Sequence, residues 1–327
     1  MQWKRYVRSA VLVAITGVSL YLLLPSLLSV FSSWHSLRDL TWYWAVLGLL
    51  AAVGSFVCLW ELNRVALHEG SWFVVGTSQL AGTAVGRIVP GGGATATAFT
   101  IGMLRRAGVQ VGQAAAALTA ASTLQIGTKL VLPLFALPAI LAGVRVAHNL
   151  AVSAYLGVAV LVLLIIGGVL AFAFDRPLVL VARATQWVLN ETIRRRRKVG
   201  ELPQRLLTVR DFVRATIGRR WMAAVVSAAG STGLDFAALL CMLRAVGAHP
   251  RPSLILLAYA AAALLALIPL TPGGVGFVEA GLVGTLTLAG LTAQEAVVAT
   301  LAYRLVSYWL PIPAGGVAYL LFRRRYP

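Results

Sequence analysis

The chain has 327 residues, of which 59% are hydrophobic and 12% are charged, and its formal net charge at pH 7 is +18. A soluble domain carries about 25% charged residues, so this composition excludes a water-soluble globular protein and indicates an integral membrane protein. The two cysteines, Cys58 and Cys241, both fall within apolar stretches. We interpret them as small buried residues rather than as disulfide partners.

Full membrane spans are predicted where an apolar stretch reaches the roughly 20 residues needed to cross a bilayer. Six stretches qualify, at about 9–31, 41–61, 111–142, 150–174, 221–243 and 292–322. The first follows a basic N-terminus, as a signal peptide would, but its apolar part is long and no A-x-A cleavage site follows. We therefore expect it to remain as a span.

Two further apolar regions, 72–104 and 253–290, are interrupted near their middles by proline and glycine. The interruptions are Pro90-Gly91-Gly92-Gly93 and Pro272-Gly273-Gly274-Val275-Gly276. Proline removes a backbone donor and glycine disfavours a helix. Backbone freed inside a membrane must be buried in protein or line a wet cavity. Each region is therefore predicted to be a re-entrant hairpin of two half-helices.

The distribution of basic residues predicts the topology. With both termini in the cytoplasm and six crossings, 21 of the 28 Lys and Arg residues fall on the cytoplasmic side, which is what the positive-inside rule requires. Only Arg38, Arg145, Arg244 and Arg251 fall outside. This asymmetry predicts a multi-pass protein of the bacterial plasma (inner) membrane.

The segment 175–220 holds twelve basic and four acidic residues. We interpret it as a cytoplasmic loop that lies on anionic lipid headgroups, where each basic residue contributes about 1 kcal/mol. A nucleic-acid partner is not expected, because no aromatic-interleaved binding motif accompanies the basic run.

An internal repeat appears when the sequence is shifted by 182 residues. Over 90–120 the shift gives eleven identities in 31 positions, including both Pro-Gly-Gly breaks. The chain then divides, as one transmembrane domain, into an N-terminal span (1–40), a first repeat (41–142), a connecting span with the basic loop (143–220) and a second repeat (221–327). In the topology above the repeats are inverted, so the two breaks meet near the midplane, where transporters commonly bind substrate. The alternative is an old duplication that serves only packing.

Ionisable residues at membrane depth are candidates for function by default. Glu279 and Arg304 are predicted to pair with each other, and Arg87 stands three residues before the first break. The N-terminus of each half-helix after a break offers amides and a positive dipole end to an anion such as a lipid phosphate. We predict a cavity between the hairpins, lined by Arg87, Thr95, Thr97, Glu279 and Arg304. The full set of candidate translocation residues is Arg87, Pro90, Gly91, Gly92, Thr95, Thr97, Asp235, Pro272, Gly273, Gly274, Gly276, Glu279 and Arg304.

Each of these residues also has a purely structural interpretation. Arg87 could be a snorkelling arginine near a helix end, and Glu279 with Arg304 could be a purely structural ion pair. Polar contacts between helices are sufficient to explain Gln79 and Gln125, although these two and Lys129 could also line a polar cavity. No P-loop, metal-ligand spacing or dinucleotide fingerprint is present, so neither a cofactor nor a metal is expected.

With these motifs in view, the chain resembles the lysylphosphatidylglycerol synthase transmembrane region family, the flippase-like domain. The resemblance rests on the second break with Phe277-Val278-Glu279, on Ala302-Tyr303-Arg304-Leu305, and on Pro311 and Gly315-Gly316. In bifunctional members this domain is fused to a cytoplasmic aminoacyltransferase that makes the lipid, whereas this chain ends at Pro327 without one. The first break has no Glu or Arg, so lysylphosphatidylglycerol is not favoured over a glycolipid or a polyprenyl-phosphate intermediate.

The sequence therefore predicts a lipid flippase for cell-envelope biogenesis, not an enzyme. Two other classes stay open. One is a membrane partner subunit of a separate lipid-modifying enzyme. The other is an integral membrane enzyme that uses Glu279 and Asp235 as acid and base. A homo-oligomer is compatible with all three.

Overall fold

The computed structural model describes residues 41–68, 71–89, 92–141, 218–265 and 276–327, together with isolated positions between 176 and 215. The described part is helical throughout and contains no strand. Several predictions concern residues outside it: the spans 9–31 and 150–174, most of the basic loop 175–220, and the break residues Pro90, Gly91, Pro272, Gly273 and Gly274.

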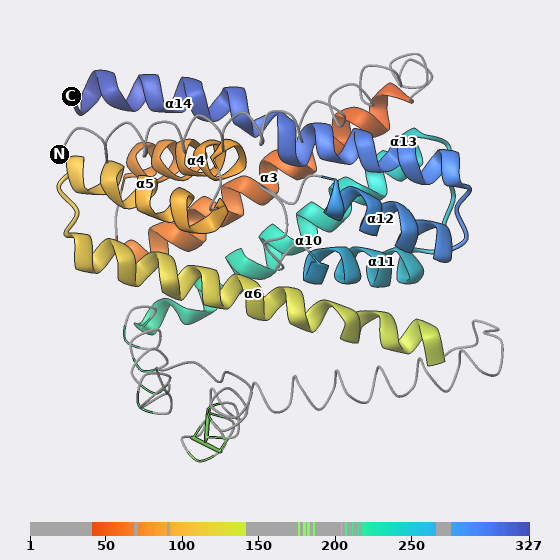
Figure 1. The fold of residues 1–327 in the computed structure, drawn as a ribbon, viewed down its shortest axis with the longest axis horizontal. Helices are drawn as coiled ribbons and strands as arrows, with labels where there is room; N and C mark the ends of the chain where they lie inside the picture. Colours follow the sequence, from red (N-terminus) through yellow and green to blue (C-terminus); the bar gives the residue numbers. More distant parts are fainter. Residues whose placement is uncertain are drawn as a thin grey trace, which may run out of the picture.

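The helices follow the predicted segments closely (Figure 1). The first half contains α3 (Trp42–Leu67), α4 (Trp72–Ile88), α5 (Gly92–Arg106) and α6 (Val111–Leu141). The second half contains η1 (Gly218–Arg220), α10 (Trp221–Ala245), α11 (Pro252–Leu265), α12 (Phe277–Leu288), α13 (Ala293–Arg304), the π-helical turn η3 (Leu305–Trp309) and α14 (Pro311–Arg325). Each region predicted to contain a break is thus a pair of short helices, α4 with α5 and α11 with α12.

Three described segments are long and apolar enough to cross a membrane: Trp42–Leu67, Trp221–Ala245 and Ala293–Arg325. Large apolar side chains face outward on them and on the short helices. Trp42 is 75% exposed and Leu288 is 88% exposed. Such a surface is suited to lipid rather than to water, in agreement with a membrane protein.

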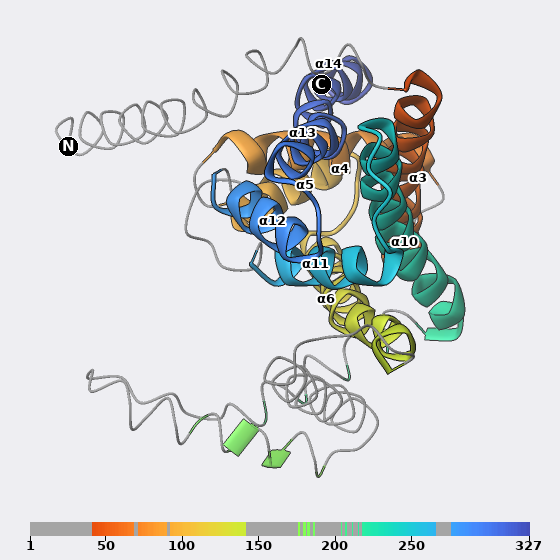
Figure 2. The same cartoon turned by 90° about the vertical axis from the view of Figure 1, so that its right-hand side faces the viewer.

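Helices α3 and α10 pack side by side in antiparallel directions (Figures 1 and 2). Near one end the Thr41 amide donates to the Ala245 carbonyl at 3.0 Å, and further along the Ser55 hydroxyl donates to the Ser231 carbonyl at 2.8 Å. Their close approach depends on small residues. A Cβ on Gly48 would lie 3.2 Å from the Cβ of Cys241. Small residues at such an interface are the usual means by which helices pack in lipid.

The two pairs of short helices lie toward opposite ends of the long axis in Figure 1. In the first pair, a Cβ on Gly86 would lie 2.9 Å from the Gly92 carbonyl oxygen and 2.7 Å from the Cβ of Ala96, so α4 and α5 touch backbone to backbone. In the second pair, the Thr285 hydroxyl on α12 lies 3.4 Å from the Ala258 carbonyl on α11.

The turns that follow α5 and α12 have the same geometry. Gly108 has φ 94° and Gly290 has φ 97°, the left-handed region that glycine tolerates best. The amides of Val109 and Leu291 donate to the carbonyls of Leu104 and Leu286, at 3.0 Å and 3.2 Å. Gly108 and Gly290 are 182 residues apart, and so are Leu104 and Leu286. The sequence identities of the repeat therefore coincide with the same local structure.

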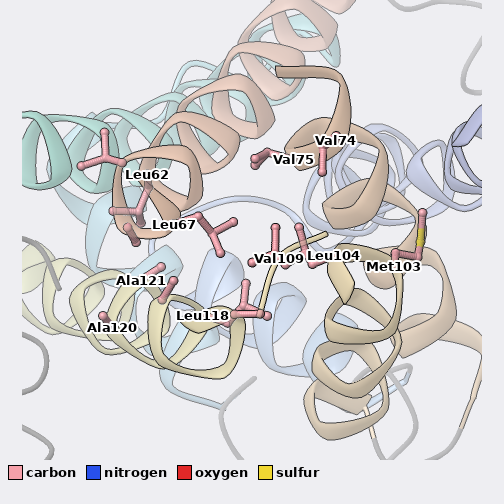
Figure 3. Packing of buried hydrophobic residues seen from close by; sticks show 14 of the residues in the cluster. Leu62, Leu67, Val74, Val75, Met103, Leu104, Val109, Leu118, Ala120 and Ala121 are labelled. Carbon is pink, nitrogen blue, oxygen red and sulfur yellow. The ribbon is translucent and has the colours of Figure 1, made fainter. Parts of the chain in front are cut away.

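The packing between elements also comes in matched pairs. Helix α4 packs on α14 as α11 packs on α6, and α5 packs on α6 as α12 packs on α13. The apolar interior of the first half is a cluster formed by α3 to α6 together with Ala224 and Ala228 of α10 and Phe322 of α14. Figure 3 shows part of it, with Leu67, Leu104 and Leu118 pointing toward one another.

Replacing Gly315 is expected to detach α14 from α4. A Cβ there would lie 2.5 Å from both the Leu80 carbonyl oxygen and the Cβ of Ala84, whereas a Cβ on the adjacent Gly316 would meet nothing within 4 Å. Overpacking typically destabilises by about 1–3 kcal/mol. Gly315→Val should therefore lower the thermal unfolding temperature of the detergent-purified protein, and Gly316→Val should leave it nearly unchanged. Equal unfolding temperatures for the two variants would contradict this α4–α14 contact.

Candidate functional site

Glu279 and Arg304 form an ion pair between the first turn of α12 and the end of α13. The Arg304 Nε lies 2.6 Å from the Glu279 Oε1, and the two side chains are 10% and 13% exposed. The pairing predicted from sequence is thus confirmed. Glu279 also caps its own helix, because its Oε2 accepts from the Gly276 amide at 2.8 Å. Gly276 can precede the helix in this way because it adopts φ 81°.

This cap bears on the α12 N-terminus, which was predicted to bind a lipid phosphate. The Glu279 carboxylate accepts from one amide there, that of Gly276, and places a negative charge at the positive end of the helix dipole. The binding of an anion at this helix end stays a prediction.

Arg87 connects the two halves of the chain. Its guanidinium donates to the carbonyl of Ser307, at 2.8 Å from Nη2, and to the carbonyl of Tyr308. In return the Tyr308 hydroxyl donates to the Arg87 carbonyl at 3.1 Å. The last turn of α4 is thereby joined to the π-helical turn η3.

The sequence explains why the Ser307 carbonyl is free to accept a hydrogen bond from Arg87. In a regular α-helix the Ser307 carbonyl would accept from the amide of residue 311, but residue 311 is proline and has no N–H. The Leu310 amide donates instead to Leu305, five residues back, at 2.9 Å, which closes the π turn. Turns of this kind are frequent at functional sites.

The guanidinium groups of Arg87 and Arg304 both lie over the aromatic ring of Tyr308. The Cζ atom of Arg304 lies 4.2 Å from the ring centroid and that of Arg87 lies 4.9 Å from it, both within the range of cation–π attraction. We call Arg87, Glu279, Arg304 and Tyr308 the arginine cluster. It contains two guanidinium groups and one carboxylate, and within the described residues the buried Nη2 of Arg304 has no hydrogen-bond partner.

Asp235 has different partners. Its Oδ2 accepts from the hydroxyl of Tyr259 at 2.6 Å and from that of Tyr303 at 2.9 Å. These contacts join α10, α11 and α13. In this arrangement the two carboxylates, Asp235 and Glu279, are held by separate groups.

A polar cavity of about 120 Å³ lies among α3, α4, α5 and α6. Of the five residues predicted to line a cavity between the hairpins, only Thr97 lines this one. The other four make their polar contacts elsewhere, although the Nη2 of Arg304 stays without a partner among the described residues. Glu279 and Arg304 pair, Arg87 binds backbone carbonyls, and the Thr95 hydroxyl donates to the Gly92 carbonyl at 2.9 Å.

The lining of the cavity includes Gln79 and Gln125, as the sequence suggested, but not Lys129. Gly92 is the first residue of α5 and has a left-handed backbone with φ 47°. No sequence pattern indicated the roles of Tyr259, Tyr303 and Tyr308. None indicated that of Asn63, which lines the cavity. Pro311, three residues after Tyr308, was the one available signal for the π turn.

Comparisons with known proteins agree with a membrane protein. The sequence model of a family described as "Lysylphosphatidylglycerol synthase TM region" matches residues 9–315. A UPF0104 membrane protein from Methanothermobacter thermautotrophicus is 30% identical over 96 residues, which is 29% of this chain and 27% of that protein. The chain thus aligns with little more than a quarter of that relative's length. No solved structure matches the chain.

Proposed function

The chain belongs to the lysylphosphatidylglycerol synthase TM region family, and from this membership and the arginine cluster we propose that it moves an anionic lipid between the leaflets of a membrane. The substrate is a phospholipid, with or without an aminoacyl or sugar modification, or a polyprenyl-phosphate lipid. The observation that carries the proposal is the buried, unpartnered Nη2 of Arg304 beside a second guanidinium.

A lipid phosphate is the group that fits this cluster. Glu279 offsets only one of the two positive charges of Arg87 and Arg304, and a buried charge is costly unless it is paired. Guanidinium groups bind phosphate through charge-assisted hydrogen bonds, which are among the strongest in proteins. A phosphate that accepts from the Arg304 Nη2 would share this arginine with Glu279, and the pair could loosen as the lipid passes.

We further propose that the two halves are inverted repeats. The antiparallel contact of α3 with α10 supports this, because these equivalent helices would be antiparallel about a two-fold axis in the membrane plane. The matched turns at Gly108 and Gly290 and the paired packing of the remaining helices support it as well.

The lengths of the short helices favour re-entrant hairpins. Helix α5 has 15 residues and α12 has 12, so they rise about 22 Å and 18 Å, whereas the hydrocarbon core is about 30 Å thick. In our proposal the first hairpin enters from the cytoplasm and the second from the opposite side, with both termini cytoplasmic and the protein in the bacterial inner membrane. The breaks would then lie at depth, where irregular backbone is tolerated only if it is buried or lines a cavity.

The rival functions are less well supported. A partner subunit would have no need of a buried arginine with an unused donor. An enzyme that uses Asp235 and Glu279 together would need both carboxylates at one reacting atom, yet their partners are two tyrosines in one case and Arg304 in the other.

The test is a leaflet-exchange assay with purified protein in phosphatidylcholine vesicles. Each preparation carries a trace of fluorescent phosphatidylglycerol or phosphatidylcholine, and dithionite bleaches the outer leaflet. We expect the protein to speed the exchange of phosphatidylglycerol well above that of phosphatidylcholine. Arg87→Gln should slow it by about tenfold, the effect of losing one charged hydrogen bond.

Arg64→Gln is the matched control, because Arg64 lies on α3 and pairs with Glu61 at 2.6 Å, outside the cluster. It should exchange lipid at the wild-type rate. If vesicles with protein behave like protein-free vesicles for both lipids, the proposed function is wrong.

A further inference from the structure

The polar cavity among α3 to α6 has a buried floor and an exposed mouth. Asn63 and Thr100 are buried at the floor, whereas Thr97 and Ser122 are exposed at the mouth. Its volume of about 120 Å³ is several times the roughly 10–15 Å³ that a single water molecule needs. A group of glycerol size fits this space.

The position of the cavity within the repeat is informative. Thr97 and Ser122 stand 182 residues before Glu279 and Arg304. The same place in the fold, between the second helix of a hairpin and the helix that follows, is thus filled by an ion pair in the second half. In the first half two small hydroxyl side chains replace the carboxylate and the guanidinium, and a cavity remains.

The hydrogen bonds of the lining define what the cavity can bind. The hydroxyls of Thr83, Thr97 and Ser122 donate to carbonyls of their own helices, at 2.8, 2.7 and 2.7 Å. Each therefore has only acceptor lone pairs left for a ligand. The buried Nε2 of Gln79 has no hydrogen-bond partner in the described part of the chain, and it offers a donor. A ligand that matches this set both donates and accepts, as an alcohol does.

Among the residues that the structure describes, no charged side chain lines the cavity. An ammonium or carboxylate entering it would lose its hydration without gaining a counter-charge, which is costly. The lining therefore favours an uncharged group with several hydroxyls over an aminoacyl group or a serine headgroup.

One face of α4 carries residues of both the cavity and the arginine cluster. Gln79, Thr83 and Arg87 are spaced four residues apart, so they lie on the same side of the helix. Four residues rise about 6 Å. A phosphate at Arg87 and a hydroxyl-bearing group near Thr83 are thus within the length of a single lipid headgroup.

We propose that this cavity binds the uncharged polyol headgroup of the transported lipid while the arginine cluster binds its phosphate. This inference rests on the proposed function and names its substrate class, a glycerol-type headgroup on an anionic lipid. The first half contributes headgroup recognition and the charge of Arg87, and the second half contributes the charges of Arg304 and Glu279.

The experiment compares three fluorescent lipids in the exchange assay: phosphatidylglycerol, phosphatidic acid, which has the phosphate without a headgroup, and phosphatidylserine. We expect phosphatidylglycerol to move about tenfold faster than phosphatidylserine. Gln79→Met keeps the side-chain length but removes the amide. It should slow phosphatidylglycerol about tenfold, to the rate of phosphatidic acid, and leave phosphatidic acid unchanged.

Thr97→Glu tests the same point by adding the carboxylate that the second half has at this position. It should slow phosphatidylglycerol and speed the aminoacylated lipid lysylphosphatidylglycerol. Equal rates for phosphatidylglycerol and phosphatidylserine, or equal slowing of phosphatidylglycerol and phosphatidic acid by Gln79→Met, would overturn the inference while leaving lipid translocation in place.

A binding measurement separates this inference from the proposed function. In detergent, phosphatidylglycerol should raise the unfolding temperature of the wild-type protein more than that of Gln79→Met, whether or not any lipid is exchanged. Glycerol 3-phosphate, which has no acyl chains, should have no such effect. Equal shifts for the two proteins, or a full shift with glycerol 3-phosphate, would reject a lipid headgroup as the occupant.

Discussion

Glu279→Gln is expected to reduce lipid exchange by about thirtyfold or more while the protein remains folded. The amide can still accept from the Gly276 amide and from Arg304, so the helix cap survives, but the negative charge that balances Arg304 is lost. Losing one member of a desolvated charge pair costs about 2–5 kcal/mol of binding, which corresponds to this range of rates. The exchange assay and the unfolding temperature measure the two effects separately.

Glu295→Gln is the matched control. Glu295 caps α13 as Glu279 caps α12, with its Oε2 2.9 Å from the Thr292 amide, but no ion pair with an arginine is described for it. Arg304→Met is the harsher change, because it leaves the Glu279 carboxylate buried and unpaired at about 3–5 kcal/mol. Wild-type exchange by Glu279→Gln would make the pair purely structural.

Cysteines placed at the two matched turns are expected to label from opposite sides of the membrane. Arg106 and Leu288 are 182 residues apart and both are exposed. In a background lacking Cys58 and Cys241, Leu288→Cys should react with an impermeant maleimide in intact cells. Arg106→Cys should react only after the cytoplasmic face is opened, because the positive-inside rule assigns this turn to the cytoplasm.

Each cysteine reacts from one side of the membrane or from the other. The labelling therefore decides between inverted and parallel repeats, which would contain the same helices. If both cysteines react from the same side, the halves are parallel repeats and the hairpins enter together. The antiparallel contact of α3 with α10 would then need another explanation.

Much of the fold could be predicted because membrane helices leave clear boundaries in sequence. The end of α5 and the start of α6 are marked by Gly108, and those of α12 and α13 by Gly290. The partner of Glu279 was also predictable, because a buried carboxylate needs a cation and Arg304 is the nearest in the following span.

The rest of the site depends on backbone geometry that no pattern of side chains reveals. Arg87 binds the carbonyls of Ser307 and Tyr308 rather than a carboxylate, and only the coordinates locate the π turn that places them. Tyr308 is an aromatic residue in an apolar stretch, so it resembles a lipid-facing side chain. The cavity was predicted between the hairpins because the two breaks were expected to meet near the midplane, and Pro90 and Pro272 lie outside the described residues, whereas the described cavity lies among α3 to α6.

The π turn also sets the rotational phase of α14. A π turn takes up one residue more than a regular helical turn, and one residue corresponds to a rotation of about 100°. If η3 were wound as a regular α-helix, α14 would rotate by about that angle relative to α13, and Gly315 would turn away from α4. The extra residue thus lets one continuous segment present a chosen face on each side of the turn, Arg304 toward Glu279 and Gly315 toward Leu80. Because Arg87 binds the carbonyls of this turn, it helps to fix the orientation of α14, a helix whose far end it does not contact.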